Sequence, residues 1–189
     1  KDKQHLLDAL EAVYTSKVNF ELEAIVIDND SQDNALEEIR QRFFADSDKA
    51  AHTKLIPNVN NGFVGGNNLG IEHATGTYTL LLNCDTKLSP DTLQTMMEFM
   101  KSRPDVGIAT CKLMKANGEL DWACRRSFPD PWVSFFRLSG LSKLFPNNKT
   151  LAAYNLTYKS IDEETEIDAC VGAFMFISPE CMKVIKGFD

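Results

Sequence analysis

Acidic side chains follow two apolar segments, at the points where buried strands are predicted to end. The segment AIVIDNDSQD places Asp28 directly after its apolar run, with Asp30 and Asp33 in the loop behind it. The segment TYTLLLNCDT places Asp85 just beyond three leucines. A carboxylate there can accept a hydrogen bond from a base or a ribose, or hold a cation that bridges two phosphates. N-capping is the favoured interpretation for Asp30 and Asp33, and a plain turn explains Asp85 as well as a metal site does.

A loop rich in Gly and Asn, NVNNGFVGGNNLG, lies between these two segments. Its Gly65-Gly66 pair is predicted to come just before a helix over 67–74, where backbone N–H groups can bind an anion. The loop is neither a Walker loop nor a G-x-G-x-x-G fingerprint, because the residues that define those motifs are absent. A tight turn therefore remains the alternative interpretation.

Helical and strand patterns alternate along the chain, which predicts an α/β fold with a mainly parallel sheet and flanking helices. Ligands in such sheets bind at the carboxyl ends of the strands, where Asp28 and Asp85 are predicted to lie. Ser89 and Pro90 are expected to begin the helix that ends before Pro104. Residues 121–165 break the pattern and are interpreted as a mobile or partner-facing insertion. The predicted strands cover residues 24–27, 52–58, 76–85 and 106–114 and the start of 166–189, and the predicted helices cover 6–13, 34–43, 67–74, 89–105 and the end of 166–189.

Composition excludes several classes of function. The 189 residues carry a net charge of -7 without a basic stripe, which argues against nucleic acid as a partner. No apolar run is long enough to span a bilayer. The five cysteines form no C-x-x-C pair and are predicted to be reduced thiols, and the three histidines lack the spacing of metal ligands.

Taken together, these segments resemble the inverting family 2 glycosyltransferases, which have the GT-A fold. AIVIDNDSQD is similar to the family's strand ending in Asp-Asn-x-Ser-x-Asp, and NNGFVGGNNLGIEHATGTYTLLLNCDT resembles its branch that transfers rhamnose and related sugars. RPDVGIATCKLMKANGEL and IDACVGAFMFISPECMKVIKGFD continue the likeness, which covers nearly the whole chain and is weakest over 128–164.

The resemblance implies a role for each residue that matches a family motif. Asp85 would hold Mg²⁺ or Mn²⁺ against the diphosphate, with Asn83 nearby at the first position of the family's Asp-x-Asp motif. Gly172 and Ala173 would line the acceptor side. The residues that would contact the donor nucleotide are Asp28, Asn29, Gly65, Gly66 and Asn67.

The resemblance also implies a single GT-A-like domain over 1–189 that is incomplete at both ends. The family's first strand would precede Lys1 and its catalytic base would lie beyond Asp189, so no catalytic base is assigned. We expect the fragment to bind donor poorly and to turn over little.

The implied enzyme moves rhamnose or a similar hexose, with inversion, from a dTDP- or UDP-linked donor to a polysaccharide or lipid-linked acceptor. Such a role in cell-envelope polysaccharide synthesis implies a cytoplasmic protein, at the inner face of the membrane without a span of its own. One alternative is a degenerate nucleotide-sugar-binding or scaffolding module, with Asn83 as the mark of lost metal chemistry. A nucleotidyltransferase or a dinucleotide-dependent oxidoreductase is a weaker alternative, because the Gly-rich loop that each requires is absent.

Overall fold

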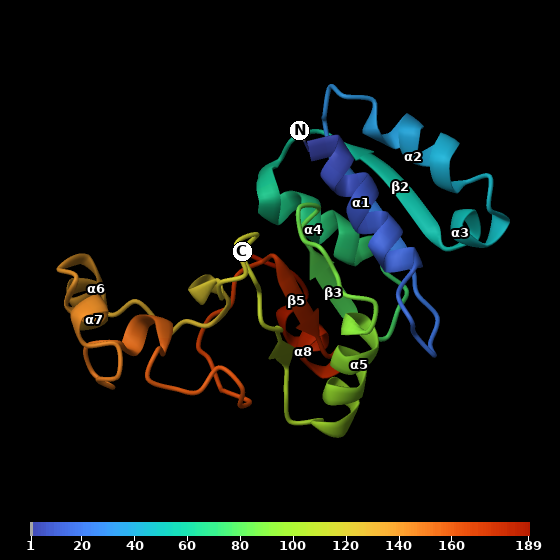
Figure 1. The fold of residues 1–189 in the computed structure, drawn as a ribbon. Coiled ribbons are helices and arrows are strands. Elements are labelled where there is room, and N and C mark those ends of the chain that lie inside the picture. The colour runs from blue at the N-terminus through green and yellow to red at the C-terminus, as the bar shows by residue number, and fades with distance from the viewer. Residues whose placement is uncertain (1) are drawn as a thin grey trace. The chain divides into compact units, whose positions relative to one another are not determined.

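The structure is a computed structural model that describes residues 2–189, and it forms two compact units (Figure 1). Unit 1 comprises Lys1–Ala109 and Ala173–Asp189, and unit 2 comprises Thr110–Gly172. A single domain over 1–189 stays a prediction. Within the described residues no helix is both long and apolar enough to cross a membrane.

Unit 1 contains strands and helices in alternation, as the sequence predicts. Its strands are β1 (Ala24–Asn29), β2 (Thr53–Asn58), β3 (Thr79–Leu82), β4 (Ile108–Ala109) and β5 (Phe174–Ile177). Its helices are α1 (Asp2–Tyr14), α2 (Ala35–Phe43), α3 (Ser47–Ala51), α4 (Gly62–His73), α5 (Thr92–Ser102) and α8 (Pro179–Ile185).

The strands of unit 1 form two ladders. β1 and β2 pair in parallel from Ala24 opposite Thr53 to Asn29 opposite Asn58, which confirms the α/β class with a parallel pair and flanking helices. β5 lies between β3 and β4 and is antiparallel to both. The alternating pattern does not predict this antiparallel strand, since β5 reaches its neighbours only after the 63 residues of unit 2.

The two faces of β1 are covered by different helices, because successive side chains of a strand point to opposite sides. Val26 packs with apolar residues of α1 and α2, among them Leu7 and Ile39, which are fully buried. Ile27 points the other way, towards Gly70 of α4. The side chains of Asp28 and Asn29, at the end of the strand, continue this alternation and point to opposite faces of β1.

Several predicted boundaries are wrong, and the strand predicted over 76–85 is shortened to Thr79–Leu82. The helix α5 begins at Thr92, not at Ser89, because residues 89–91 form a turn in which the Thr92 N–H donates to the Ser89 carbonyl at 3.0 Å. The strand predicted over 106–114 is reduced to Ile108–Ala109, since only these residues pair with β5. The helix predicted over 67–74 begins earlier, at Gly62.

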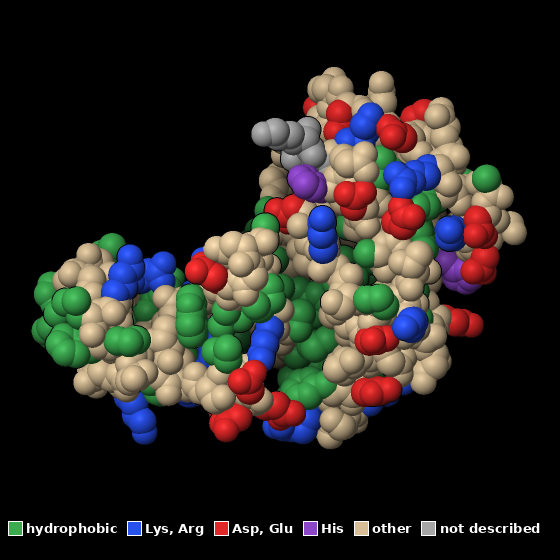
Figure 2. All heavy atoms as spheres, viewed as in Figure 1, with side chains coloured by type: hydrophobic (Ala, Val, Ile, Leu, Met, Phe, Trp, Pro, Cys, Tyr) green, Lys and Arg blue, Asp and Glu red, His purple; other side chains and the backbone are tan. Residues whose placement is uncertain are grey.

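Unit 2 contains short helices that the sequence patterns do not predict. They are η1 (Trp122–Cys124), α6 (Pro131–Leu138), α7 (Leu141–Leu144) and η2 (Ala153–Asn155). Arg137 of α6 stacks over the Tyr154 ring at 4.0 Å and donates to the Asn155 side chain at 2.8 Å, so α6 is tied to η2. The surface over α6 and α7 is rich in exposed hydrophobic side chains (Figure 2).

Cys111 of unit 2 has a thiol that resists ionisation. Burial raises its pKa to about 11, and the neighbouring Cys124 adds to the shift. At pH 8 only roughly one Cys111 thiol in a thousand is the reactive thiolate. We expect iodoacetamide to modify the exposed Cys84 first and Cys111 far more slowly, with a Cys111 rate that climbs up to about pH 11. Mass spectrometry of the alkylated chain would follow both rates, and equal rates at pH 8 would contradict the raised pKa of the half-buried Cys111.

Candidate active site

The carboxyl ends of β1 and β2 lie side by side at Asn29 and Asn58, and they form the edge where α/β proteins bind ligands. Asp28 is half-buried at this edge, and its Oδ1 accepts the Ser31 N–H at 2.9 Å. This bond holds the loop behind β1 in a tight turn. Asp33 accepts the Ala35 N–H at 3.1 Å, but the N-cap of α2 is Asn34, whose side chain forms no capping bond, so the predicted N-cap role of Asp33 is wrong.

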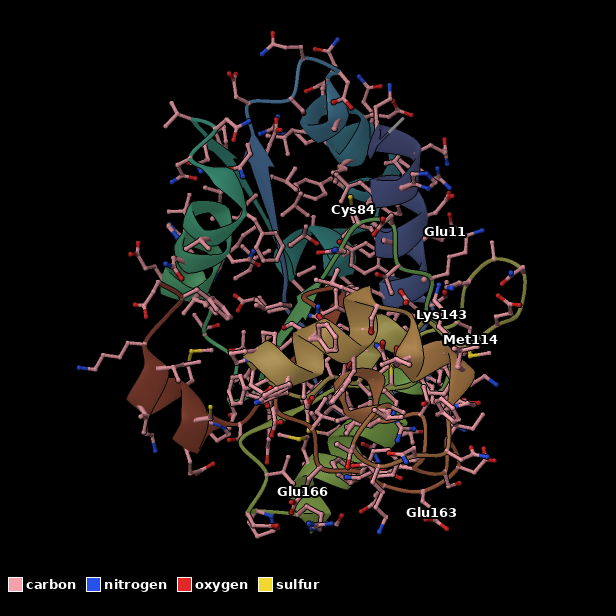
Figure 3. All side chains as sticks on the ribbon, turned by 90° about the vertical axis from the view of Figure 1, so that its left-hand side faces the viewer. Glu11, Cys84, Met114, Lys143, Glu163 and Glu166 are labelled. Carbon is pink, nitrogen blue, oxygen red and sulfur yellow. The ribbon has the colours of Figure 1, made fainter. Side chains whose placement is uncertain are left out.

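Asp28 opens into a small pocket of about 90 Å³. Lys3 and Leu6 of α1 and Cys84 from the loop after β3 also line it, so the end of β1 and the loop after β3 share one pocket. Figure 3 shows Cys84 on this loop, near α1. Lys3 is the only cation among the described lining residues, and its hydrogen bond to Glu38 raises its pKa. The pocket is therefore lined by two carboxylates, those of Asp28 and Asp33, and by the Lys3 ammonium group, which is paired with Glu38 at 2.6 Å.

Asp85 is exposed in a turn directly after β3, one residue beyond Cys84. The Thr86 N–H closes this turn on the Asn83 carbonyl at 3.0 Å. The Ala173 carbonyl, at the start of β5, accepts both the Asn83 N–H at 3.1 Å and the Thr86 hydroxyl at 3.2 Å. Ala173 thus fixes the turn that presents Asp85, whereas Gly172 belongs to unit 2.

Asp85 is not part of a ready-made metal cage. Within residues 2–189 no group of three or more His, Cys, Asp or Glu side chains could hold a metal ion. Mg²⁺ and Mn²⁺ commonly bind one or two carboxylates and take their other ligands from water and substrate phosphates. A lone exposed carboxylate such as that of Asp85 fits that mode of binding.

The amides of three asparagines join the ends of β1, β2 and α4, and the sequence does not reveal this network. Asn58 donates to the Asn29 oxygen at 2.7 Å and to the Asn61 oxygen at 2.9 Å. Asn29 in turn donates to the Gly62 carbonyl at 3.0 Å. The network closes the turn before α4, and this explains why the helix begins at Gly62.

Gly65 and Gly66 therefore lie inside α4 and not before its start. A Cβ atom on Gly66 would come within 2.8 Å of the Asn29 side-chain nitrogen, and one on Gly65 within 2.3 Å of the Asn61 Cγ. The two glycines thus let α4 approach the asparagine network, which corrects their predicted place at a helix N-terminus. Contact with a donor nucleotide stays a prediction for both.

The predicted donor residues lie in two places. Asp28 shares a pocket with Cys84, whereas Asn29, Gly65 and Gly66 pack together on the α4 side of β1. Asn67 donates to the Phe63 carbonyl at 2.7 Å within α4. The alternation of side chains along β1 therefore separates Asp28 from its neighbour Asn29.

Asn68, which sequence reasoning did not single out, anchors the segment that follows α8. Its amide donates to the Phe188 carbonyl at 2.9 Å and accepts the Phe188 N–H at 2.8 Å. Position 187, beside Asn68, requires a glycine. The φ of Gly187 is +153°, and a Cβ atom there would lie 2.8 Å from the Asn68 side-chain oxygen. Residues 187–189 are thereby held against α4.

We expect Asn68→Asp to release residues 187–189. The carboxylate cannot donate to the Phe188 carbonyl, so one bond is lost and a repulsive oxygen pair replaces it, at a cost of about 2 kcal/mol. Hydrogen exchange at the Phe188 amide would measure the release. Asn67→Asp is the matched control on the same helix, and equal exchange in the two variants would contradict the anchor.

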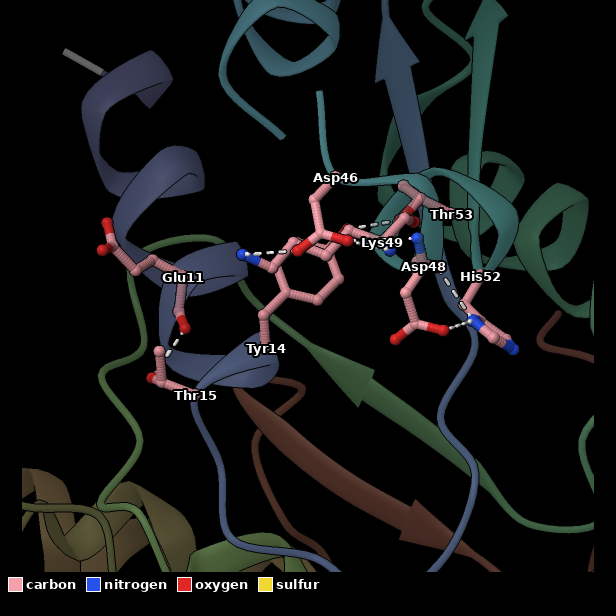
Figure 4. Close-up of polar contacts among 8 residues, drawn as sticks. All are labelled: Glu11, Tyr14, Thr15, Asp46, Asp48, Lys49, His52 and Thr53. Carbon is pink, nitrogen blue, oxygen red and sulfur yellow. Dashed lines mark hydrogen bonds and ion pairs between the residues drawn. The ribbon is translucent and has the colours of Figure 1, made fainter. Parts of the chain in front are cut away.

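A larger hollow of about 560 Å³ lies at the opposite, amino-terminal ends of β1 and β2. Its polar groups already satisfy one another: Asp46 caps α3 and lies 3.6 Å from the Lys49 ammonium, and the Thr53 hydroxyl donates to the Lys49 carbonyl at 2.6 Å (Figure 4). None of the predicted site residues lines it. The smaller pocket at the carboxyl ends is therefore the better candidate for chemistry.

Comparison with known proteins identifies the family to which the chain belongs. Residues 3–166 match the family described as "Glycosyl transferase family 2". An uncharacterized glycosyltransferase, YibD of Escherichia coli K12, is 31% identical over 113 residues, which cover 60% of this chain and 29% of YibD.

Two solved structures share the fold. The mannosyltransferase PcManGT from Pyrobaculum calidifontis, in complex with GDP-Man and Mn²⁺, aligns over 99% of this chain and 44% of its own, with a TM-score of 0.65 and 17% identity. TarS 1–349 of S. aureus, in complex with UDP-GlcNAc, aligns over 70% of this chain and 35% of its own, with a TM-score of 0.52 and 18% identity. The GT-A fold is confirmed, and this chain spans less than half the length of each of these proteins.

Proposed function

Because the chain belongs to glycosyl transferase family 2, we propose that the protein transfers a sugar from a nucleoside-diphosphate donor. The observation that carries the proposal is the pocket in which Asp28 meets the loop of Asp85. This pocket lies at the carboxyl end of β1 and at the loop after β3, and these two segments carry the motifs that are similar to those of the family. The donor nucleotide would enter there, with a base N–H or ribose hydroxyl donating to Asp28.

Asp85 would hold a divalent cation together with the donor diphosphate. The backbone of its turn is held by the Ala173 carbonyl, which accepts from the Asn83 N–H and the Thr86 hydroxyl. A bound Mg²⁺ or Mn²⁺ would supply positive charge that stabilises the departing nucleoside diphosphate. PcManGT, whose structure contains Mn²⁺, supports this use of metal.

The reaction would be a single displacement at the anomeric carbon. An acceptor hydroxyl loses its proton to a general base and attacks, the bond to the diphosphate breaks, and the configuration inverts. No residue of this chain is assigned as that base. Asp28 and Asp85 would act on the donor side, and Gly172 and Ala173 would line the acceptor side.

The finer identity of the substrates rests on sequence likeness. We propose rhamnose or a similar hexose on dTDP or UDP, a polysaccharide or lipid-linked acceptor, and a place at the cytoplasmic face of the membrane. UDP-GlcNAc in the TarS structure and GDP-Man in the PcManGT structure support a nucleotide-sugar donor. The second candidate is a non-catalytic nucleotide-sugar-binding module, which Asn83 favours because it removes a carboxylate from the metal site.

A thermal-shift panel tests the proposed donor class. The chain would be melted with dTDP, UDP, GDP or NAD⁺, each with Mn²⁺ and with EDTA. We expect dTDP or UDP to raise Tm in Mn²⁺ alone, because only the metal joins Asp85 to the diphosphate. Stabilisation by NAD⁺ would instead favour an oxidoreductase, and a chain that no nucleotide stabilises would contradict the donor site.

A further inference from the structure

Five large apolar side chains are exposed on the two short helices of unit 2. Trp132 is 71% exposed, Leu138 86% and Leu144 72%, and Phe135 and Phe145 are each about half exposed. We call these five residues the α6–α7 patch. Figure 2 shows hydrophobic side chains gathered over this part of unit 2, with basic groups at the edge.

The members of the patch on α6 share one face of the helix. Trp132, Phe135 and Leu138 follow one another at intervals of three residues, which places them within about a third of the helix circumference. The opposite side of α6 is held inward by Arg137, which stacks on Tyr154. The exposed face is therefore a fixed feature of unit 2 and not the result of a loosely attached helix.

The charges around the patch have the opposite sign to the protein as a whole. Residues 128–149 contain three cations, Arg137, Lys143 and Lys149, and one acid, Asp130, whereas the chain carries a net charge of -7. The Asp130 carboxylate is engaged at the start of α6, where it accepts the Trp132 and Val133 N–H groups at 2.8 and 2.9 Å.

Both lysines are exposed, and neither forms an ion pair with another described residue. Figure 3 shows Lys143 beyond the ribbon of these helices, and the labelled acids Glu163 and Glu166 lie well apart from it. Among the described residues, therefore, neither lysine is neutralised by an ion pair with a carboxylate.

We propose that the α6–α7 patch binds the surface of an anionic lipid bilayer. An amphipathic helix that carries Trp, Phe and Leu on one face, with Lys and Arg beside it, lies in the membrane interface. The aromatic and leucine side chains would enter the boundary between headgroups and acyl chains, while Lys143 and Lys149 would contact lipid phosphates. The positive charge of this segment would overcome the repulsion between an acidic protein and an anionic surface.

This inference does not depend on sugar transfer, so its test needs no nucleotide. The 189-residue chain with Trp122→Phe keeps Trp132 as its only tryptophan. It would be mixed with phosphatidylcholine vesicles with and without phosphatidylglycerol. We expect flotation with the anionic vesicles, a blue shift of Trp132 emission, and release by raised salt, which screens the lysines.

Two pairs of variants separate the apolar and the electrostatic contributions. Leu138→Ser with Leu144→Ser should lower the partition coefficient at least about tenfold, since two exposed leucines no longer enter the bilayer. Lys143→Gln with Lys149→Gln should lower it by about fivefold per lysine. Val184→Ser, at another exposed apolar position, and Lys101→Gln are matched controls that should bind like the parent.

Absence of binding to either vesicle would overturn the proposal, and so would unchanged binding by the patch variants. Sedimentation velocity should find a monomer without lipid. The proposal would also be overturned if the chain did not bind vesicles but formed a dimer that Leu138→Ser with Leu144→Ser converts to a monomer. The patch would then be an interface between two copies of the chain.

Discussion

Gly66→Ala is expected to destabilise the protein by about 2 kcal/mol, a large effect for one methyl group. The new Cβ would meet the Asn29 side-chain nitrogen at 2.8 Å, and Asn29 cannot withdraw without losing its bonds to Gly62 and Asn58. Either α4 moves away from β1 or the asparagine network breaks. Chemical denaturation with circular dichroism would measure the change in free energy of unfolding.

Gly70→Ala is the matched control, because it adds the same methyl group to the same helix. Its Cβ would make only an ordinary contact of 3.6 Å with Ile27, and alanine favours a helix over glycine by up to about 1 kcal/mol. Gly70→Ala should therefore be neutral or stabilising. If both variants changed stability equally, close packing at Gly66 would be ruled out as the cause.

Asp85→Ala is expected to weaken metal-dependent binding of dTDP or UDP by about a hundredfold, or ~3 kcal/mol. This carboxylate is the side chain that we propose as the protein's ligand to the metal beside the diphosphate. Its turn is held by backbone bonds from Asn83 and by the Thr86 hydroxyl, so the variant should keep its fold. Equilibrium dialysis of the nucleotide in Mn²⁺ would give the two affinities.

The control for Asp85→Ala is Asp91→Ala, an exposed acid at the start of α5 whose side chain forms no capping bond. It removes the same charge from the same loop region and should leave nucleotide affinity unchanged. An equal loss in both variants would mean that general electrostatics, and not a ligand at position 85, controls binding.

The sequence predicts those parts of the fold that depend on local patterns. The apolar runs of β1 and β3 and the amphipathic pattern of α1 are readable because the period of the side chains reveals the element. The start of α4 could not be predicted, since Gly and Asn have low helix propensity and distant amides of Asn29 and Asn58 close the turn. The place of β5 between β3 and β4 is equally non-local.

The candidate site is predictable to a similar extent. Asp28 and Asp85 are recognisable because each follows an apolar strand. The expectation that parallel pairing joins them is not met, since β3 pairs antiparallel with β5 and, among the described residues, only Cys84 brings its loop to the Asp28 pocket. Lys3 in the pocket and Asn68 against Phe188 are not recognisable, because their partners lie far away in the chain. The separation of Asp28 from Asn29 follows from alternation along β1, which motif matching ignores.

The central claim is that this chain holds a nucleoside diphosphate through a metal at the pocket shared by the end of β1 and the loop after β3. Isothermal titration of the wild-type chain with dTDP and with UDP, in Mn²⁺ and then in EDTA, tests it most directly. We predict weak but saturable binding of at least one nucleotide in Mn²⁺, which EDTA abolishes. Binding that is equally strong in EDTA, or heats of dilution alone under all conditions, would contradict the claim.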